Sequence, residues 1–357
     1  MQFLSDNNVT SDKAADRAML EKPALYVVGG TQRKDAADKE LWNRYCGAVV
    51  VRIDTATGEI TNRLDYESPA QVCPDDGKSV TFKAATLRGD LLYVPTTTEV
   101  LIYRLPDFEK INYVSLPHFN DLHHVLPNGS DTFYVASTGL DMVFELSESG
   151  EVLREWAVAN ESPWSRFSRD VDYRKIGSTK PHLSHPNFLF QLDGETWVTR
   201  CDSKDAMCLT KEQPLIDLGD GANPHDGVIY KDKIFFTLVD GTIAIVDATT
   251  RKLIEYVRLN ELMGTRHPLG WCRGIEILDD DIVVVGFSRL RQTRWQHKVR
   301  WTKRYLGGDG HWLYPTRIAA FDLKAKTMLW ELDLEPFDLN AVFSIHRDMM
   351  STGQAIG

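Results

Sequence analysis

The feature that most constrains the fold is a unit of four short apolar runs in residues 223–257, NPHDGVIYKDKIFFTLVDGTIAIVDATTRKLIEYV. Each run is rich in the β-branched and aromatic residues that suit a pleated, half-buried surface. Each is separated from the next by a hairpin-length turn such as Asp240-Gly241. The unit therefore predicts one antiparallel sheet with strands at 227–230, 234–238, 242–246 and 253–257.

The second half of this unit, two strands joined by a turn, recurs along the chain. The clear copies are VVVRIDTATGEITNRL from residue 49, VLIYRLPDFEKINYV from 100, MVFELSESGEVLREW from 142, TIAIVDATTRKLIEYV from 242 and RIAAFDLKAKTMLWEL from 317. A weaker sixth copy lies in 185–218, where only the first two strands are regular. A period of about 40 residues with four strands per unit is the signature of a β-propeller. We therefore predict an all-β fold, a six-bladed propeller with four-stranded antiparallel blades.

The inner strands of the blades show how such a ring would close. Counting back from the second strands places inner strands at 82–86, 123–126, 185–190, 225–230 and 272–278. The first blade lacks its own inner strand, and the C-terminal run 342–350 has no blade. We expect this run to pair beside 24–28, because closing the ring removes exposed sheet edges. Residues 23–357 are thus expected to form a single propeller domain, with a leader at 1–22 outside the repeat.

Composition restricts the class of protein. A chain of 357 residues with 43% hydrophobic content is long enough for a large core, and a net charge of -10 argues against bulk nucleic-acid binding. The first 22 residues lack a signal-peptide core, and no run approaches the roughly 18 apolar residues of a membrane span. The five cysteines are scattered and odd in number. These features favour a cytoplasmic protein with reduced thiols that binds neither membrane nor nucleic acid.

The blade architecture over about residues 24–350, with turns such as DTATGE at 54–59, resembles a known superfamily of six-bladed propellers. That superfamily includes the senescence marker protein and gluconolactonase group, strictosidine-synthase-like proteins and arylsulfotransferase-like proteins. The resemblance implies the propeller fold. The Glu, Asn and Asp metal ligands expected of the gluconolactonase group have no counterpart here, and no catalytic motif of these families can be matched residue by residue.

Histidines gather at one position of the predicted repeat. The first residues of the inner strands meet at one mouth of a propeller's channel, and Arg273 takes this place in one of the strands. Histidines occupy it on four inner strands: His123 and His124, of which either is expected to point into the channel, on one strand, and His185, His225 and His346 on the others. Convergent neutral imidazoles suit a first-row metal, and a ring of them without carboxylates is similar to the iron site of the carotenoid cleavage oxygenases, which are also propellers. We therefore predict a divalent metal ion, iron or zinc.

Two other interpretations of the histidines stay open: polar lining of a wet channel, and acid–base catalysis without metal. Three neighbouring carboxylates, Asp121, Asp226 and Glu276, are candidates to orient the imidazoles or, with Arg273, to act in catalysis, although they would equally serve to cap strands. His118, His182 and His267 lie in connecting segments and are weaker candidates. Cys272 is expected to be a buried structural thiol rather than a ligand or nucleophile.

Three long insertions, at about 30–46, 159–184 and 288–314, are predicted to emerge at the same mouth as the histidines. The last carries seven cations against one acid. Cations alternating with aromatic residues predict a lid that binds an anionic substrate through charge and stacking. Its candidate binding residues are Arg294, Arg300, Arg304, Trp301 and Trp312. The alternatives are a solvated basic face, a subunit contact, or binding of single-stranded nucleic acid.

These observations lead to one function and one alternative. The first is a metal-dependent enzyme that acts on a small anionic, aromatic or partly apolar substrate by oxygenase, lyase or hydrolase chemistry. The alternative is a non-enzymatic propeller that binds a protein or small ligand through its loop face. No nucleotide cofactor is indicated, and the sequence does not indicate an oligomeric state.

Overall fold

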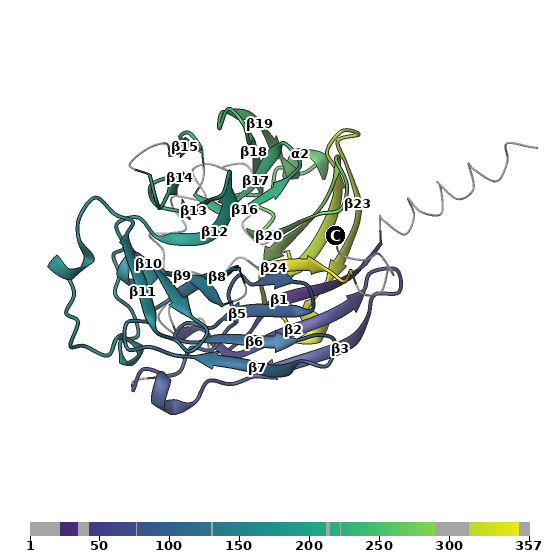
Figure 1. Ribbon diagram of the computed structural model, residues 1–357. Helices are drawn as coiled ribbons and strands as arrows, with labels where there is room; N and C mark the ends of the chain where they lie inside the picture. Colours follow the sequence, from purple (N-terminus) through teal and green to yellow (C-terminus); the bar gives the residue numbers. More distant parts are fainter. Residues whose placement is uncertain are drawn as a thin grey trace, which may run out of the picture.

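The chain folds into six four-stranded antiparallel sheets arranged as a ring (Figure 1). The computed structural model describes residues 22–34, 43–75, 77–129, 131–211, 215–221, 223–289 and 314–349. The innermost strand of each sheet faces the centre of the ring, as β8, β12, β16, β20 and β24 do in Figure 1. The predicted six-bladed propeller is therefore confirmed. No helix in these ranges combines the length and the apolar character needed to cross a membrane.

The blades are numbered here in chain order, and each is given from its inner to its outer strand. Blade 1 contains β24 (Ala341–Arg347), β1 (Ala24–Gln32), β2 (Tyr45–Asp54) and β3 (Glu59–Tyr66), and blade 2 contains β4 (Thr86–Arg88), β5 (Leu91–Pro95), β6 (Val100–Arg104) and β7 (Glu109–Val114). Blade 3 contains β8 (Leu122–Asn128), β9 (Thr132–Ser137), β10 (Met142–Ser147) and β11 (Val152–Ala157), and blade 4 contains β12 (Pro186–Leu192), β13 (Glu195–Arg200), β14 (Asp205–Cys208) and β15 (Leu215–Asp217). Blade 5 contains β16 (Pro224–Tyr230), β17 (Lys233–Leu238), β18 (Thr242–Asp247) and β19 (Leu253–Arg258), and blade 6 contains β20 (Trp271–Ile277), β21 (Ile282–Ser288), β22 (Arg317–Asp322) and β23 (Thr327–Asp333).

Blade 2 departs from the expected bounds. Its inner strand was expected at 82–86, but β4 covers only Thr86–Arg88. The N–H groups of Phe82 and Ala84 donate to the carbonyl groups of Gly29 and His123, which belong to the adjacent blades. Because these groups bond to neighbouring blades, the ladder between β4 and β5 stays short.

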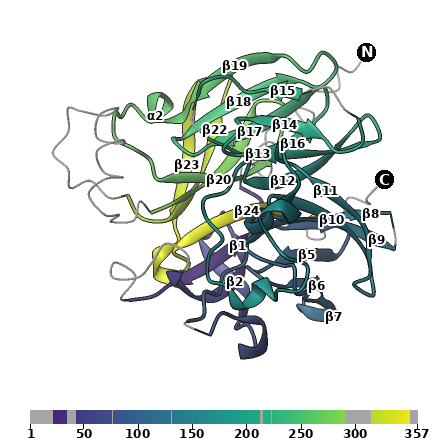
Figure 2. The same cartoon turned by 90° about the vertical axis from the view of Figure 1, so that its left-hand side faces the viewer.

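Ring closure occurs as predicted. Strand β24 pairs antiparallel with β1, with Val27 opposite Ile345 and Leu25 opposite Arg347. In Figure 2 the yellow β24 lies beside the purple β1. The last strand of the chain thus completes the first blade, although it begins and ends earlier than the predicted 342–350.

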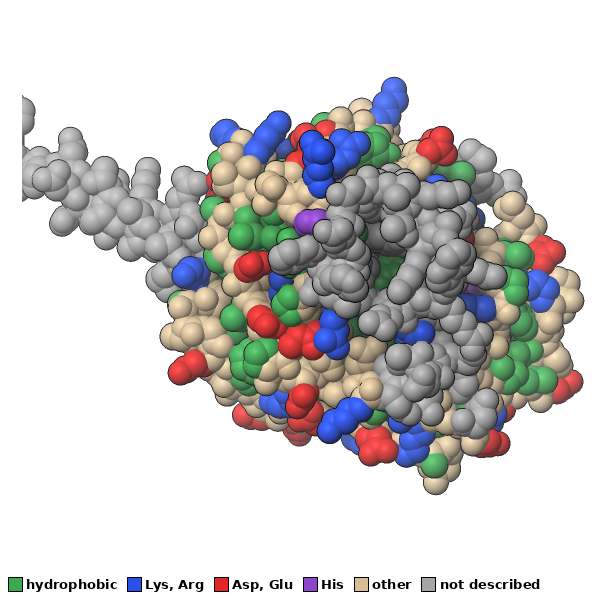
Figure 3. All heavy atoms as spheres, turned by 180° about the vertical axis from the view of Figure 1, so that it is seen from behind, with side chains coloured by type: hydrophobic (Ala, Val, Ile, Leu, Met, Phe, Trp, Pro, Cys, Tyr) green, Lys and Arg blue, Asp and Glu red, His purple; other side chains and the backbone are tan. Residues whose placement is uncertain are grey.

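The core is divided into layers between neighbouring blades. In blade 5, Ile234 and Phe236 pack against blade 4, whereas Phe235 and Ile243 pack against blade 6. Side chains alternate between the two faces of a strand, so a sheet covered on both faces needs apolar residues at almost every position. This requirement explains the continuous apolar runs of the sequence. On the face in Figure 3, by contrast, cationic and acidic side chains are interspersed around the rim.

Most inner strands carry an irregularity near their start. The register shifts by one extra residue on β8, β12, β16, β20 and β24, so that two residues oppose one on the second strand. The inserted positions are His123 on β8, Asn187 on β12, residues 226–227 on β16, residues 273–274 on β20 and Phe343 on β24. A bulge redirects side chains relative to the regular pleat. Gly274 permits one of these bulges, because its φ is 76° and an added Cβ would lie 3.0 Å from the Cα of Ser344.

Candidate functional site

A cavity opens where the inner strands begin, at the mouth that also carries the 159–184 insertion. We call it the loop-side cavity; its volume is about 200 Å³. Its charged and imidazole-bearing lining residues are Lys83, Asp121, His123, Lys180, His182, His185 and Arg273. Hydroxyl and amide groups of Ser79, Thr97, Asn120 and Thr179 and the ring of Phe343 complete much of the wall. The cavity therefore combines ionisable side chains with neutral hydrogen-bonding groups.

Three imidazoles line this cavity, and a fourth, that of His225, lies close to them. The ring centroids of His123 and His185 are 5.0 Å apart, and those of His185 and His225 are 6.4 Å apart. His182 comes from the insertion, and its Nδ1 lies 3.3 Å from the Nδ1 of His185. The expected gathering of imidazoles at one mouth is therefore present for His123, His185 and His225, with His182 added.

Burial keeps these imidazoles neutral. It lowers the pKa of His185 to about 3 and holds the pKa values of His123 and His225 well below the usual 6.5. The Nδ1 of His123 donates to the carbonyl oxygen of Asp121 at 2.8 Å, since a carbonyl can only accept. His123 thus keeps a free lone pair on Nε2, which is available to accept a proton or to bind a metal.

His225 has the opposite tautomer. The amide Nδ2 of Asn187 donates to the carbonyl oxygen of Pro224 at 2.8 Å and to the Nδ1 of His225 at 2.9 Å. Because Nδ1 accepts, a neutral His225 carries its proton on Nε2. His225 is therefore a hydrogen-bond donor rather than a metal ligand at Nε2.

Cations surround the imidazoles. The Nζ of Lys83 lies 3.1 Å from the Oδ1 of Asp121. Burial raises the pKa of Asp121, but the surrounding positive charges, of which Lys83 is the strongest, together outweigh this effect and hold that pKa well below 3.8. The guanidinium carbon of Arg273 lies 5.2 Å from the ring centre of Phe343 and 5.9 Å from that of Trp271. The predicted catalytic candidates Asp121 and Arg273 thus share the cavity with the imidazoles.

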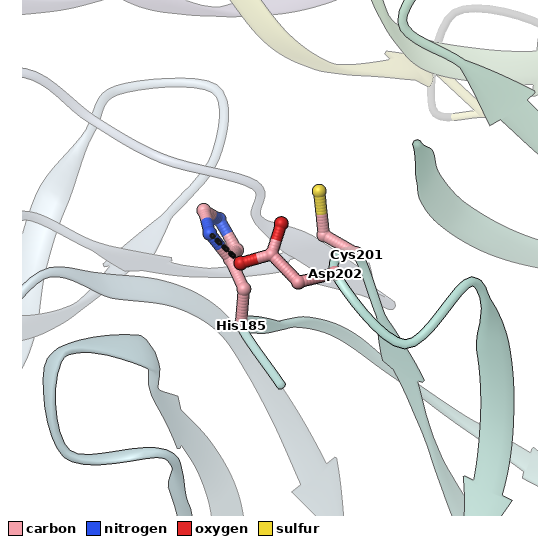
Figure 4. A group of neighbouring side chains, drawn as sticks. All are labelled: His185, Cys201 and Asp202. Atoms are coloured by element: carbon pink, nitrogen blue, oxygen red, sulfur yellow. Dashed lines mark ion pairs between the residues drawn. The ribbon is translucent and has the colours of Figure 1, made fainter. Parts of the chain in front are cut away.

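One group of side chains at the edge of this site could hold a metal ion. The donor atoms of His185, Cys201 and Asp202 lie within 4.8 Å of one another, and Figure 4 shows the Asp202 carboxylate turned toward the imidazole. The Oδ2 of Asp202 is 3.7 Å from the Nδ1 of His185. Zinc–ligand bonds of about 2.0 to 2.3 Å place neighbouring donor atoms roughly 3 to 4 Å apart. The donor atoms of this group lie within 4.8 Å of one another, so they would bind a tetrahedral ion after moving slightly closer together. Burial raises the pKa of the Cys201 thiol to about 12, so that an ion there would have to displace its proton.

The histidine-bearing end of the insertion is fixed by a buried carboxylate. Asp141 is 1% exposed and accepts hydrogen bonds from the N–H groups of Leu183, Ser184 and His185, each at 2.9 Å. Its second oxygen also pairs with Arg166 at 3.1 Å. These bonds hold His185 at a φ of 57°, a backbone conformation that non-glycine residues seldom adopt. Asp141 is thus a positioning residue for His182 and His185.

A buried amide fixes the preceding part of the insertion. The Nδ2 of Asn120 donates to the carbonyl oxygens of Tyr173 and Ile176, at 2.9 and 2.7 Å. Its Oδ1 accepts from the hydroxyl of Thr179 at 3.2 Å. The wall of the cavity formed by residues 176–180 is therefore tied to the start of blade 3.

The other end of the channel contains a second cavity, of about 290 Å³, which we call the hairpin-side cavity. His124 there stacks on Phe188 at 3.9 Å, and its Nδ1 accepts from the N–H of Leu189. Asp226 accepts from the N–H of Gly274 at 2.9 Å and from the hydroxyl of Thr237. Burial raises the pKa of Glu276 to about 7 and lowers that of His346 to about 4. Apolar side chains form most of the remaining wall.

The two cavities correct the predicted site. His124, His346, Asp226 and Glu276 line the hairpin-side cavity, so the expectation that His346 joins the cluster is wrong, and of His123 and His124 it is His123 that lines the loop-side cavity. His346 is the sixth residue of β24 and not near its start, and His124 follows the bulge residue His123 and points the other way. His182 was expected to be a weaker candidate, but it lines the loop-side cavity. Its position three residues before His185 could have indicated this placement.

Two further groups of predicted residues have different outcomes. The lid residues Arg294, Arg300, Arg304, Trp301 and Trp312 lie outside the described residues, as does nearly all of the leader at 1–22. The five cysteines are free, and Cys272 is fully buried with a pKa that burial raises well above 9.0. Its protonated, enclosed thiol agrees with a structural role.

No protein family and no curated protein sequence matches this chain. Its fold is similar to that of a crystallised protein of unknown function from Bacteroides caccae, with a TM-score of 0.57 and 12% identity over 90% of this chain and 98% of that one. A structure of the mitotic checkpoint complex also matches, with a TM-score of 0.46 and 8% identity over 84% of this chain and 74% of that one. The first likeness supports the fold and carries no information about function.

Proposed function

We propose that this chain is an enzyme that acts on a small anionic organic substrate in the loop-side cavity. The observation that carries the proposal is the meeting of the neutral imidazoles of His123, His182 and His185 with the cations Lys83 and Arg273 in one enclosed space. Neutral imidazoles can move protons or bind a metal ion, and the cations would hold a negative substrate beside them.

The proposed cofactor is a divalent ion, zinc or iron, bound at His185 with Asp202 and a third donor. The third donor is Cys201 or His182, whose Nδ1 lies 3.3 Å from that of His185. Such an ion would polarise a substrate oxygen or activate water, and iron would permit oxygen chemistry. His225 would donate a hydrogen bond through Nε2, and His123 would accept a proton on Nε2.

Elemental analysis tests the cofactor directly. The protein, purified without a metal-affinity step, is expected to carry close to one zinc or iron per chain, and His185→Ala is expected to lose it. His118→Gln is the matched control, because the Nε2 of His118 bonds to the carbonyl oxygen of Arg169 and its ring packs on Trp164, away from the cavity lining. Metal content that is equal in His185→Ala and the parent would overturn the assigned ligands.

A second candidate function is acid–base catalysis without metal. The fixed Nδ1–H of His123 and its free Nε2 favour this candidate, since that arrangement is what a general base requires. Protein that turns over a substrate without bound metal, and loses turnover in His123→Gln, would select it. A protein with neither metal nor turnover would be the non-enzymatic ligand-binding propeller.

A further inference from the structure

The loop-side cavity has an uncompensated positive charge. Among the described residues that line it, three are cationic, Lys83, Lys180 and Arg273, and one is a carboxylate, Asp121. Lys83 is 8% exposed and is already paired with Asp121, whereas Lys180 lies exposed at the rim. The charge that lacks a counterion inside the cavity is therefore that of Arg273.

Among the described residues, Arg273 is positioned by packing against aromatic rings. In the described part of the chain it has no ion-pair partner, and its Nε is buried without a hydrogen bond. The guanidinium lies beside the rings of Phe343 and Trp271. Burial of a charge without a partner is costly, and burial lowers the pKa of this group. A guanidinium without a counterion beside a cavity is a candidate group to bind the anionic end of a ligand.

Arg273 and the aromatic ring beside it come from equivalent positions on neighbouring blades. Arg273 and Phe343 occupy the bulges of β20 and β24, which are neighbouring inner strands. The Nζ of Lys83 lies 5.1 Å from the ring centre of Phe343, so both cations lie against the same aromatic side chain. Tyr45 packs edge-on against Phe343 and extends the aromatic wall.

We propose that Arg273, with Lys83 and the Phe343 wall, forms an oxyanion-binding subsite that takes the carboxylate or phosphate group of a small organic ligand. A planar guanidinium binds two oxygen atoms of such a group at once, and the aromatic wall accommodates its organic body. The inference rests on the proposed function, because it identifies the anionic end of the proposed substrate.

Anion binding to chelator-treated protein tests the subsite separately from any metal. Benzoate, acetate and inorganic phosphate are titrated by calorimetry and by the rise in melting temperature, with glycerol as a neutral comparison. Arg273→Gln is expected to weaken the best of these anions by roughly tenfold or more, and Arg273→Lys by less. Benzoate binding more tightly than acetate supports the aromatic wall, and a preference for phosphate over both carboxylates assigns a phosphorylated ligand.

Arg347→Gln is the matched control, since Arg347 is a half-buried arginine at the other end of an inner strand and does not line the loop-side cavity. Arg273→Lys keeps the charge, so it remains informative if Arg273→Gln does not fold. Equal anion affinity in the parent and both Arg273 variants overturns the subsite even if metal is bound. Anion binding that depends on Arg273, in a protein whose untreated form contains neither zinc nor iron by elemental analysis, leaves the subsite standing and removes the proposed cofactor.

Discussion

The two ends of the propeller channel are built from the same inner strands but offer different chemistry. The loop-side cavity has imidazoles, Lys83 and Arg273 under a long insertion, whereas the hairpin-side cavity is largely apolar around Glu276 and His346. Adjacent residues of β8 serve different ends, since His123 lines the first cavity and His124 the second.

This difference comes from the bulges. A regular strand would present alternate residues along the whole channel in one continuous pattern. The extra residue near the start of five inner strands breaks that pattern and directs residues such as His123, Arg273 and Phe343 to the loop side. Propeller geometry sets the ring, and the bulges decide which side chains meet at one mouth.

Removal of β24, which lines both cavities, is expected to have the largest effect. Truncation after Asn340 deletes β24 and leaves β1 as an unpaired inner edge of blade 1. We expect insoluble protein, because an open ring exposes hydrogen-bonding edges and apolar surface. Solubility on expression and cooperativity of thermal unfolding are the measurements, with truncation after Met349 as the control. A soluble, cooperatively folding truncation would show that closure is dispensable.

A change confined to the loop-side cavity is expected to have the next largest effect on stability. Asp141→Asn removes a buried carboxylate that accepts three N–H groups and pairs with Arg166, at an expected cost of about 2 to 4 kcal/mol in the free energy of unfolding. It should also weaken zinc binding, because His182 and His185 lose their anchor. Urea denaturation and zinc titration measure the two effects. Asp172→Asn, a less buried carboxylate that bonds Arg174, should change stability by less than half as much.

A change confined to the hairpin side is expected to act through pH. Glu276 has its pKa raised to about 7 in the folded protein, chiefly by burial, against 4.5 when unfolded. As the pH rises from 4.5 to 7, the unfolded chain releases this proton first, so the parent loses stability across that window. Glu276→Gln removes the loss and should be more stable than the parent at pH 8 by at most about 3 kcal/mol, with little difference at pH 4. Urea midpoints at both pH values measure this.

Exposed Glu59→Gln serves as the control for that pH experiment. It should leave the difference in urea midpoint between pH 4 and pH 8 as it is in the parent. A Glu276→Gln variant with the parent's pH dependence would mean that the hairpin-side cavity is wet enough to keep Glu276 ionised.

The smallest effect on stability is expected from the cationic insertion at 288–314. Neutralising Arg294, Arg300 and Arg304 together should alter stability by no more than about 0.5 kcal/mol each, while weakening capture of an anionic ligand. Ligand affinity should fall with added salt in the parent and less steeply in the triple variant. The same affinity and salt response in both proteins would confine anion recognition to the cavity.

The sequence was sufficient to predict the ring but not its site. Strand periodicity and hairpin turns repeat in every blade, so the strands of blade 5 and the pairing of β24 with β1 could be derived from local patterns. Successive residues of a strand point in opposite directions, so His123 and His124 could be expected to separate, but the bulge at His123 had no local signal and left open which of the two lines the loop-side cavity. His346 was misplaced because it was assigned to the entrance of its strand, although it is the fifth residue of the predicted run 342–350 and the sixth of β24. The anchoring of His182 and His185 by Asp141 depends on a contact over more than 40 residues.

The pairing of β24 with the first blade also determines when the loop-side cavity is completed during synthesis of the chain. Phe343, which lines the loop-side cavity, belongs to β24. The inner edge of β1 stays unpaired until β24 has been synthesised. Blades 2 to 6 can assemble as they emerge from the ribosome, since each is formed by consecutive strands. The loop-side cavity can be completed only after β24 has left the ribosome. A chain that stalls or ends before β24 therefore cannot carry a complete site.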